Sequence, residues 1–295
     1  MPVIKLCEDV KIIRCSIHIV TRDRPESLAL LLTSLIFQTY KNWDMVILDN
    51  SRNTKINNYY LIRTIINRLQ LEGHRFHVIE NNDEHRDIGK YRNQVIEADP
   101  FKNNIGIRID DDSICEPNYI EILMNGFTDN KIGIVGGIVP YLFYPKTYIL
   151  QPEKFNEIPS FFVPWTDHCT NFVRFIDNDG KDLHYKKTYF ESGHIRSSYA
   201  YRIYLAKKIR FPEWSGPTGY TEETVFCIKT WLNGYKVIIN PNAVCWHTAY
   251  IVGGGRDKIS GQEQMNQIKK NNEERMQTEL DIYRKTLGIK ERGYP

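Results

Sequence analysis

The first 140 residues alternate between short β-branched runs and amphipathic helical patterns, and this alternation restricts the possible folds more than any other feature. Strands are predicted at Ile12–Val20, Met45–Leu48, Arg75–Glu80, Ile105–Ile109 and Ile132–Val139. Apolar residues at helical spacing predict helices at 25–36, 56–71, 86–98 and 117–127. Such alternation is typical of an α/β fold with a mostly parallel sheet flanked by helices. Ligands of these folds bind at the carboxyl ends of the strands.

The second part of the chain is less regular. Residues 140–190 are rich in aromatic residues and proline, and they show no clear periodicity. A helix is predicted at 221–233, ended by Gly234, and two short strands are predicted at 237–240 and 243–246. A glycine-rich loop and a polar helix over 262–287 follow, so we expect one compact unit with a C-terminal helical tail.

Composition excludes several classes of protein. A net charge of +3 over 295 residues gives no support to a nucleic-acid partner, although it does not exclude one. No apolar run approaches the roughly 20 residues that span a bilayer. The six cysteines show no paired spacing, so neither a zinc site nor a disulfide framework is predicted. We therefore expect a cytoplasmic protein, with peripheral membrane contact as an alternative.

Three consecutive aspartates, Asp110, Asp111 and Asp112, follow the fourth predicted strand. Adjacent carboxylates repel one another unless a cation, basic side chains or water offsets their charge. A metal and a phosphate ligand would meet at such a strand end. The alternative is a solvated acidic turn that caps the helix starting near Pro117. The triplet alone favours neither interpretation.

Other polar groups fall at equivalent strand ends. Thr21–Pro25 follows the first predicted strand, and Asp49–Ser51 follows the second. Taken singly, Asp49 is typical of a turn with a side-chain cap, and Arg22 and Arg24 are typical of solvated surface residues. Because parallel strands end at one edge of the sheet, these groups together predict a ligand site there.

The same segments resemble the inverting nucleotide-sugar glycosyltransferases of family 2, which have the Rossmann-like GT-A fold. The resemblance rests on Ser16–Pro25, Leu35–Asp44 (LIFQTYKNWD), Gly89–Asn93, the aspartate triplet with Pro117, Gly219–Glu223, and the block from Gly234 to His247. It covers about residues 12–139 and 209–247. It implies a GT-A domain over 1–250, with a nucleotide-sugar half at 12–139, an acceptor half at 140–250 and an extension at 251–295.

The resemblance also implies a donor site built from strand ends and loops, made of Thr21, Asp23, Asp49, Arg92, Asp110, Asp111 and Arg256. Asp49 would accept a hydrogen bond from the base, since a carboxylate can accept the imide N–H of uracil. Arg256 would close over the diphosphate as part of a mobile loop. Arg92 is also consistent with a surface position at a helix start, and the glycine run with an ordinary hinge.

For the metal, the resemblance implies Asp112 as a direct ligand and His247 as a further ligand. Asp110 belongs to the same site but would lie farther from the ion than Asp112. Oxygen ligands suit Mg²⁺ or Mn²⁺, and Mn²⁺ tolerates the histidine nitrogen better. An equally good interpretation of His247 is a strand-end histidine packed beside Trp246.

An inverting displacement requires a general base, and the resemblance places Glu222 and Glu223 there, with Glu223 preferred. Glutamate replaces the aspartate of the family's pair, so Glu222 stays a candidate. Both acids would also favour a helix N-terminus in a protein without activity. On the acceptor side, Trp214 would stack on a sugar or belong to the core, and His194 would face the cleft.

These predictions combine into a metal-dependent, inverting glycosyltransferase that uses a nucleotide sugar, with a UDP-sugar as the first candidate. The acceptor would be a hydroxyl of a glycan, a lipid-linked molecule or a protein. Two alternatives remain at this point: a nucleotidyltransferase on a related sheet, and a non-catalytic protein that binds sugar nucleotides. The chain lacks the glycine-rich, lysine-containing loop after the first strand that many nucleotidyltransferases use.

Overall fold

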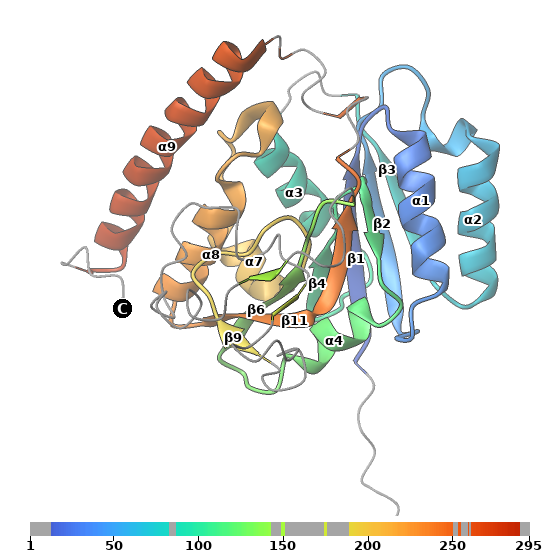
Figure 1. Ribbon diagram of the computed structural model, residues 1–295, viewed down its shortest axis with the longest axis horizontal. Helices are drawn as coiled ribbons and strands as arrows, with labels where there is room; N and C mark the ends of the chain where they lie inside the picture. Colours follow the sequence, from blue (N-terminus) through green and yellow to red (C-terminus); the bar gives the residue numbers. More distant parts are fainter. Residues whose placement is uncertain are drawn as a thin grey trace, which may run out of the picture.

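A nine-stranded sheet forms the centre of the protein in a computed structural model (Figure 1). The structure describes residues 13–82, 87–142, 149–150, 174–175, 189–249, 253–254, 259 and 261–289. The strand order is β3-β2-β1-β4-β10-β6-β11-β5, and β9 also pairs with β11. The strands are β1 (Cys15–Thr21), β2 (Trp43–Asp49), β3 (Phe76–Glu80), β4 (Ile105–Arg108), β5 (Ser113–Cys115), β6 (Ile132–Ile138), β9 (Phe190–Glu191), β10 (Tyr199–Arg202) and β11 (Lys236–His247). A separate pair joins β7 (Ile149–Leu150) to β8 (Arg174–Phe175).

Two parallel blocks make up most of this sheet. Strands β3, β2, β1 and β4 pair in parallel, as do β6 and β11, while β10 runs antiparallel between the two blocks. All seven residues of β2 are buried, as expected for a parallel strand covered on both faces. The predicted α/β fold with a mostly parallel sheet is therefore confirmed.

Helices cover both faces of the sheet (Figure 1). One hydrophobic core packs α1, α2 and α4 against the first face, and a second packs α3, α7 and α8 against the other. The helices are α1 (Pro25–Ile36), α2 (Tyr60–Leu71), α3 (Ile88–Glu97), α4 (Tyr119–Asn125), α7 (Ile203–Ile209), α8 (Glu222–Leu232) and α9 (Gly261–Thr286). Local sequence explains several starts: Pro25 occupies the first turn of α1, and the Asp87 side chain caps α3 by accepting from the Lys90 N–H at 2.9 Å.

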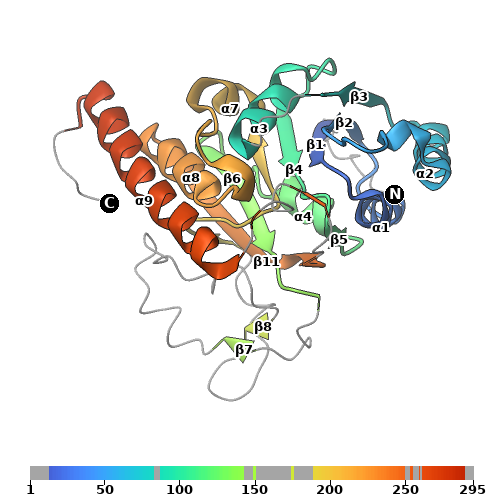
Figure 2. The same cartoon turned by 90° about the horizontal axis from the view of Figure 1, so that it is seen from above.

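Helix α9 lies outside α8 (Figure 2). Its buried residues are Asn272, Met276, Leu280 and Arg284, at a spacing of four residues. Met276 and Leu280 pack with Val225 of α8. The predicted C-terminal helical tail is thus a packed part of the fold. Among the described residues, none of the helices combines the length and apolar character that a membrane span requires.

The structure corrects four local predictions. The predicted helix at 56–71 is a 3₁₀ turn (Ile56–Asn58) followed by α2, and the helix at 117–127 is shortened to α4. The two strands at 237–246 form one strand, β11, whose pairing with β6 shifts register between Ile239 and Val244. Strands β5 and β10 were not predicted, because short strands carry little local signal and depend on their partners.

Candidate active site

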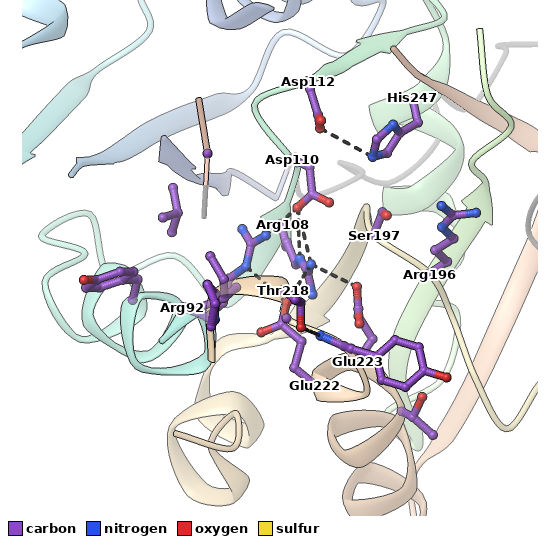
Figure 3. Close-up of a pocket in the computed structure, with 18 of the residues that line it drawn as sticks. Arg92, Arg108, Asp110, Asp112, Arg196, Ser197, Thr218, Glu222, Glu223 and His247 are labelled. Atoms are coloured by element: carbon purple, nitrogen blue, oxygen red, sulfur yellow. Dashed lines mark hydrogen bonds and ion pairs between the residues drawn. The ribbon is translucent and has the colours of Figure 1, made fainter. Parts of the chain in front are cut away.

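One cavity of about 850 Å³ opens at the carboxyl ends of β1 and β4. Its wall includes the ends of β1 and β11, the aspartate triplet, the first turn of α8 and part of α9. Ten of its residues are labelled in Figure 3, with acidic and basic side chains interleaved. The cavity therefore lies where ligands of open α/β sheets bind.

Strand β5 brings the triplet to the end of β11. Ser113, the residue after the triplet, pairs with His247 across the antiparallel β5–β11 ladder. The Asp112 carbonyl also accepts from the Thr248 N–H at 2.8 Å. As a result, ligand atoms of Asp110, Asp112 and His247 all lie within 4.8 Å of one another. Two carboxylates and an imidazole form a donor set that fits Mn²⁺ or Mg²⁺.

The imidazole of His247 is held on both nitrogens. Its Nδ1 accepts from the Ala249 N–H at 2.8 Å, and its Nε2 lies 3.6 Å from Asp112 Oδ1. A neutral ring with Nδ1 as acceptor carries its proton on Nε2. A metal bound through Nε2 would need the proton on Nδ1, so the Ala249 N–H would have to turn away. Ala249 has a φ of +54°, which is uncommon for a residue other than glycine.

Asp110 is neutralised by two arginines. Arg92 of α3 binds Asp110 Oδ1, and Nη2 of Arg108 lies 3.3 Å from the same oxygen. Burial alone would raise the pKa of Asp110, but Arg108 and Arg92 together lower it below its usual range. Asp110 is therefore ionised in the structure.

Asp111 and Asp112 share a third arginine, Arg24, from the start of α1. Its Nη1 lies 3.2 Å from Asp111 Oδ1 and 2.9 Å from Asp112 Oδ2. The Thr21 hydroxyl donates to Asp111 Oδ2 at 2.8 Å. Burial raises the pKa of Asp111 to about 6, with Asp112 adding to the rise and Arg24 opposing it. The triplet is thus a buried ionic cluster, and the solvated-turn interpretation does not describe it.

The two glutamates begin α8 and face Arg108. Arg108 Nη2 lies 2.9 Å from Glu222 Oε1 and 3.1 Å from Glu223 Oε1 (Figure 3). The Glu222 side chain is 1% exposed and that of Glu223 is 15% exposed. Burial raises the pKa of Glu222 to about 7, and Glu223 adds to the rise while Arg108 opposes it. The two acids therefore occupy different environments on one helix turn.

Several predicted site residues line the cavity: Thr21, Arg92, Asp110, Asp111, Asp112, His194, Glu222, Glu223 and His247. His194 contacts α8 through its Nδ1, 3.1 Å from the Thr224 hydroxyl. The structure thus brings together nine residues from six separate places in the sequence.

Three predicted residues are not part of this lining. Asp49 accepts from the N–H groups of Ser51 and Ile56, at 2.9 and 2.7 Å, so both its oxygens are used by its own loop. Asp23 likewise accepts from the Arg52 N–H at 2.9 Å. Trp214 donates its indole N–H to Glu279 of α9 and packs with the α8–α9 core. Arg256, which was predicted to contact the diphosphate, lies outside the described residues.

Sequence reasoning assigned no role of its own to two arginines at the centre of the site, Arg24 and Arg108. Arg24 belongs to the strand-end group at Thr21–Pro25, but taken singly it was interpreted as a solvated surface residue. Arg108 did give a signal: it is a charged residue inside an apolar strand, two positions before the triplet. A buried charge is tolerated only with partners, so the nearby acids were the candidates.

Solved structures support the fold. The chain resembles S. aureus TarS 1–349 in complex with UDP-GlcNAc, with a TM-score of 0.58 and 14% identity over 87% of this chain and 64% of that one. It resembles the mannosyltransferase PcManGT from Pyrobaculum calidifontis, in complex with GDP-Man and Mn²⁺, with a TM-score of 0.55 and 15% identity over 82% and 58%. It also resembles GalNAc-T7 with UDP, GalNAc and Mn²⁺, with a TM-score of 0.62 and 12% identity over 94% and 55%. At these identities the similarity shows the fold alone, and the predicted GT-A fold is confirmed.

The chain spans between 37% and 64% of the length of the TarS chains that it matches. No curated protein sequence is significantly similar to it. Its residues 16–197 match the family described as Glycosyl transferase family 2. Since this match covers more than half of the 295 residues, the chain belongs to glycosyl transferase family 2.

Proposed function

We propose that the protein is a metal-dependent, inverting glycosyltransferase that moves a sugar from a nucleotide sugar to an acceptor hydroxyl. One observation carries this proposal: the Asp110–Asp112–His247 donor set and the Glu223 carboxylate line the same cavity. The first group suits a metal-bound diphosphate, and the second suits a general base.

Acidic side chains gather in the part of the cavity that holds the aspartate triplet and the start of α8. We call Asp110, Asp111, Asp112, Glu222 and Glu223, with Arg24, Arg92 and Arg108, the carboxylate network. When all are ionised, this network has two more carboxylates than guanidinium groups, and Arg22, Arg196 and Lys269 also line the cavity. A bound Mn²⁺ or Mg²⁺ would supply charge neutralisation for the leaving diphosphate. Asp110 and Asp112 would hold it, and His247 would join them once the Ala249 N–H turns away from its Nδ1.

The base would be Glu223. Its side chain is more open to the cavity than that of Glu222, so it can reach an acceptor. The acceptor hydroxyl gives its proton to the Glu223 carboxylate while its oxygen forms a bond to the anomeric carbon. The bond from that carbon to the diphosphate oxygen breaks, and its electron pair leaves with the nucleotide. Attack opposite the leaving group inverts the anomeric configuration.

The donor would lie beside Thr21, Asp111, Arg92 and Arg24. Their contacts join the triplet to the end of β1, the start of α1 and helix α3. The proposed donor is a UDP-sugar, since the resolved relatives include complexes with UDP-GlcNAc and with UDP. PcManGT was solved with GDP-Man, so GDP must be tested beside UDP. His194 would lie on the acceptor side.

Titration calorimetry with UDP, GDP and CDP, each with Mn²⁺ and with EDTA, tests this function. We expect one nucleotide to bind only with Mn²⁺, and Asp112→Asn to weaken that binding by about 100-fold because a metal ligand is lost. Asp129→Asn is the matched control: Asp129 accepts from the Lys131 N–H and does not line the cavity. No binding of any of the three nucleotides would overturn the proposed function.

A further inference from the structure

Arg108 connects the two ends of the cavity. Its Nη2 lies 3.3 Å from Asp110, 2.9 Å from Glu222 and 3.1 Å from Glu223 (Figure 3). Asp110 belongs to the proposed metal site, and Glu223 is the proposed base. One guanidinium group therefore contacts both the acid that would hold the donor and the acid that would activate the acceptor.

The guanidinium is fixed by its surroundings. Arg108 is 3% exposed, and its Cζ lies 5.5 Å from the centre of the Tyr199 ring on the neighbouring strand β10. Tyr199 is fully buried, and its ring packs against those of Tyr201 and Phe226. The backbone of Arg108 lies in β4, which pairs with β1 and β10. Few alternative rotamers are open to a long side chain packed in this way.

The three carboxylates depend on Arg108 to different degrees. Asp110 has a second cation, Arg92, and Glu222 Oε1 lies 3.8 Å from Arg92 Nε. Within the described part of the chain, Glu223 is ion-paired with Arg108 only. Removal of Arg108 would therefore leave Asp110 paired, while Glu223 would lose the contact that sets its direction.

We propose that Arg108 is a positioning residue that holds the carboxylate of Glu223 at a fixed place relative to Asp110. This role rests on the proposed function, because it sets the gap in which acceptor oxygen and donor sugar meet. Small errors in such a gap reduce the rate strongly, since the reacting atoms must approach to about 3–3.5 Å. Arg108 itself touches neither the acceptor proton nor the leaving group in this scheme.

Arg108 can also be regarded as a purely structural cation that compensates three buried acids. Both roles predict that its loss lowers stability, so stability alone cannot separate them. They differ in how turnover responds. A positioning residue affects kcat and leaves nucleotide binding nearly unchanged, whereas a general structural role affects both together with the melting temperature.

The test is nucleotide release from the donor with water as acceptor, which needs no knowledge of the natural acceptor. The donors are UDP-glucose, UDP-galactose, UDP-N-acetylglucosamine and GDP-mannose, each with Mn²⁺, and the fastest is used. For Arg108→Ala we expect kcat to fall by about 100-fold, within the range of general-base effects. The Kd of the matching nucleotide diphosphate should change by less than about threefold, because Arg92 still holds Asp110.

Two further readouts keep the outcome decisive. Guanidinium at millimolar concentration should raise the kcat of Arg108→Ala, while the same concentration of sodium chloride should not. Arg108→Lys keeps the positive charge but lacks the planar, forked guanidinium group, so its kcat should lie between those of wild type and Arg108→Ala. Arg75→Met is the control, since Arg75 pairs with the buried Asp44 away from the cavity. Its kcat should match that of wild type.

An unchanged kcat in Arg108→Lys and Arg108→Ala would overturn the positioning role, as would equal losses in kcat and nucleotide affinity without rescue by guanidinium. A wild-type protein that neither binds nucleotide nor hydrolyses any of these donors would instead overturn the proposed function. The two failures are therefore distinguished by the wild-type measurement.

Discussion

Two buried ionisable clusters share strands of the same sheet, and only one of them opens on the cavity. In the closed cluster, His18 of β1 bonds Tyr201 of β10 through Nδ1 and Asp99 through Nε2, which lies 3.0 Å from Asp99 Oδ2. His18 and Asp99 side chains are 1% and 2% exposed. None of the three lines the cavity.

The carboxylate network differs in what it leaves unsatisfied. Arg92 Nη1, Arg108 Nη1 and Glu222 Oε2 are buried without a hydrogen-bond partner among the described residues. The closed cluster uses both imidazole nitrogens, and burial lowers the pKa of His18 although Asp99 opposes the change. A cluster that completes its own bonds stabilises the fold. A cluster that keeps buried bonding capacity beside a cavity is where a ligand is expected.

Glu223→Gln should show most clearly that the two clusters have different roles. We expect turnover of the donor to fall by about 1,000-fold, because an amide cannot accept the acceptor proton. Nucleotide binding and the melting temperature should stay close to those of wild type, since the side chain keeps its size and partial exposure. Donor hydrolysis measured beside calorimetry checks this. Glu213→Gln serves as control, because Glu213 pairs with Arg210 and lies outside the cavity lining. Turnover at the wild-type rate would rule out Glu223 as base.

Asp99→Asn should produce the opposite pattern. The substitution removes a buried carboxylate that accepts from His18 and from the Phe101 N–H at 2.8 Å. We expect the free energy of unfolding to fall by about 3 kcal/mol, as for a broken buried charged hydrogen bond. Nucleotide affinity of the folded protein should not change. Urea unfolding and calorimetry on the same sample test both parts, and a loss of affinity would place this cluster among the functional residues.

The sequence carried enough information for the parallel strands and for nine of the residues that line the cavity. Strands β1, β2 and β4 are buried on both faces, so they appear as mostly apolar runs, and their polar ends identify the edge where the site forms. The meeting of Asp112 with His247 was not predictable from local patterns. It depends on β5, three residues long, pairing with a strand more than 120 residues further along the chain.

The pairing of Arg24 was the other part that local patterns could not supply. Arg24 is close to Asp111 and Asp112 only because β1 and β4 are neighbours in the sheet. Asp49 shows the reverse case: its strand-end position is correct, but its oxygens are taken by the N–H groups of the following turn. Neither outcome follows from residue type and spacing, because both depend on side-chain direction.

Glu222→Gln tests the carboxylate network through pH. A carboxyl group whose pKa rises from 4.5 to about 7 on folding binds more protons in the folded state. Stability is therefore largest below pH 4.5 for this group and falls as the pH rises through 7. Between pH 5 and 7 the wild type should lose about 2 kcal/mol more than Glu222→Gln. Urea unfolding of metal-free protein at both pH values measures the difference. Parallel pH profiles would mean that Glu222 is ionised in the folded protein.

The smallest effect is expected from Trp214→Phe. Trp214 belongs to neither cluster. Trp214 is half-buried, donates to Glu279 and packs with Met276 and Leu280, so it fastens α9 to α8 without lining the cavity. Phenylalanine keeps most of the apolar contact and loses one hydrogen bond, so stability should fall by about 1 kcal/mol. Turnover should remain at the wild-type value in the hydrolysis assay. A lower turnover at unchanged stability would instead support the predicted contact of Trp214 with a sugar, and would extend the functional region to the α8–α9 junction.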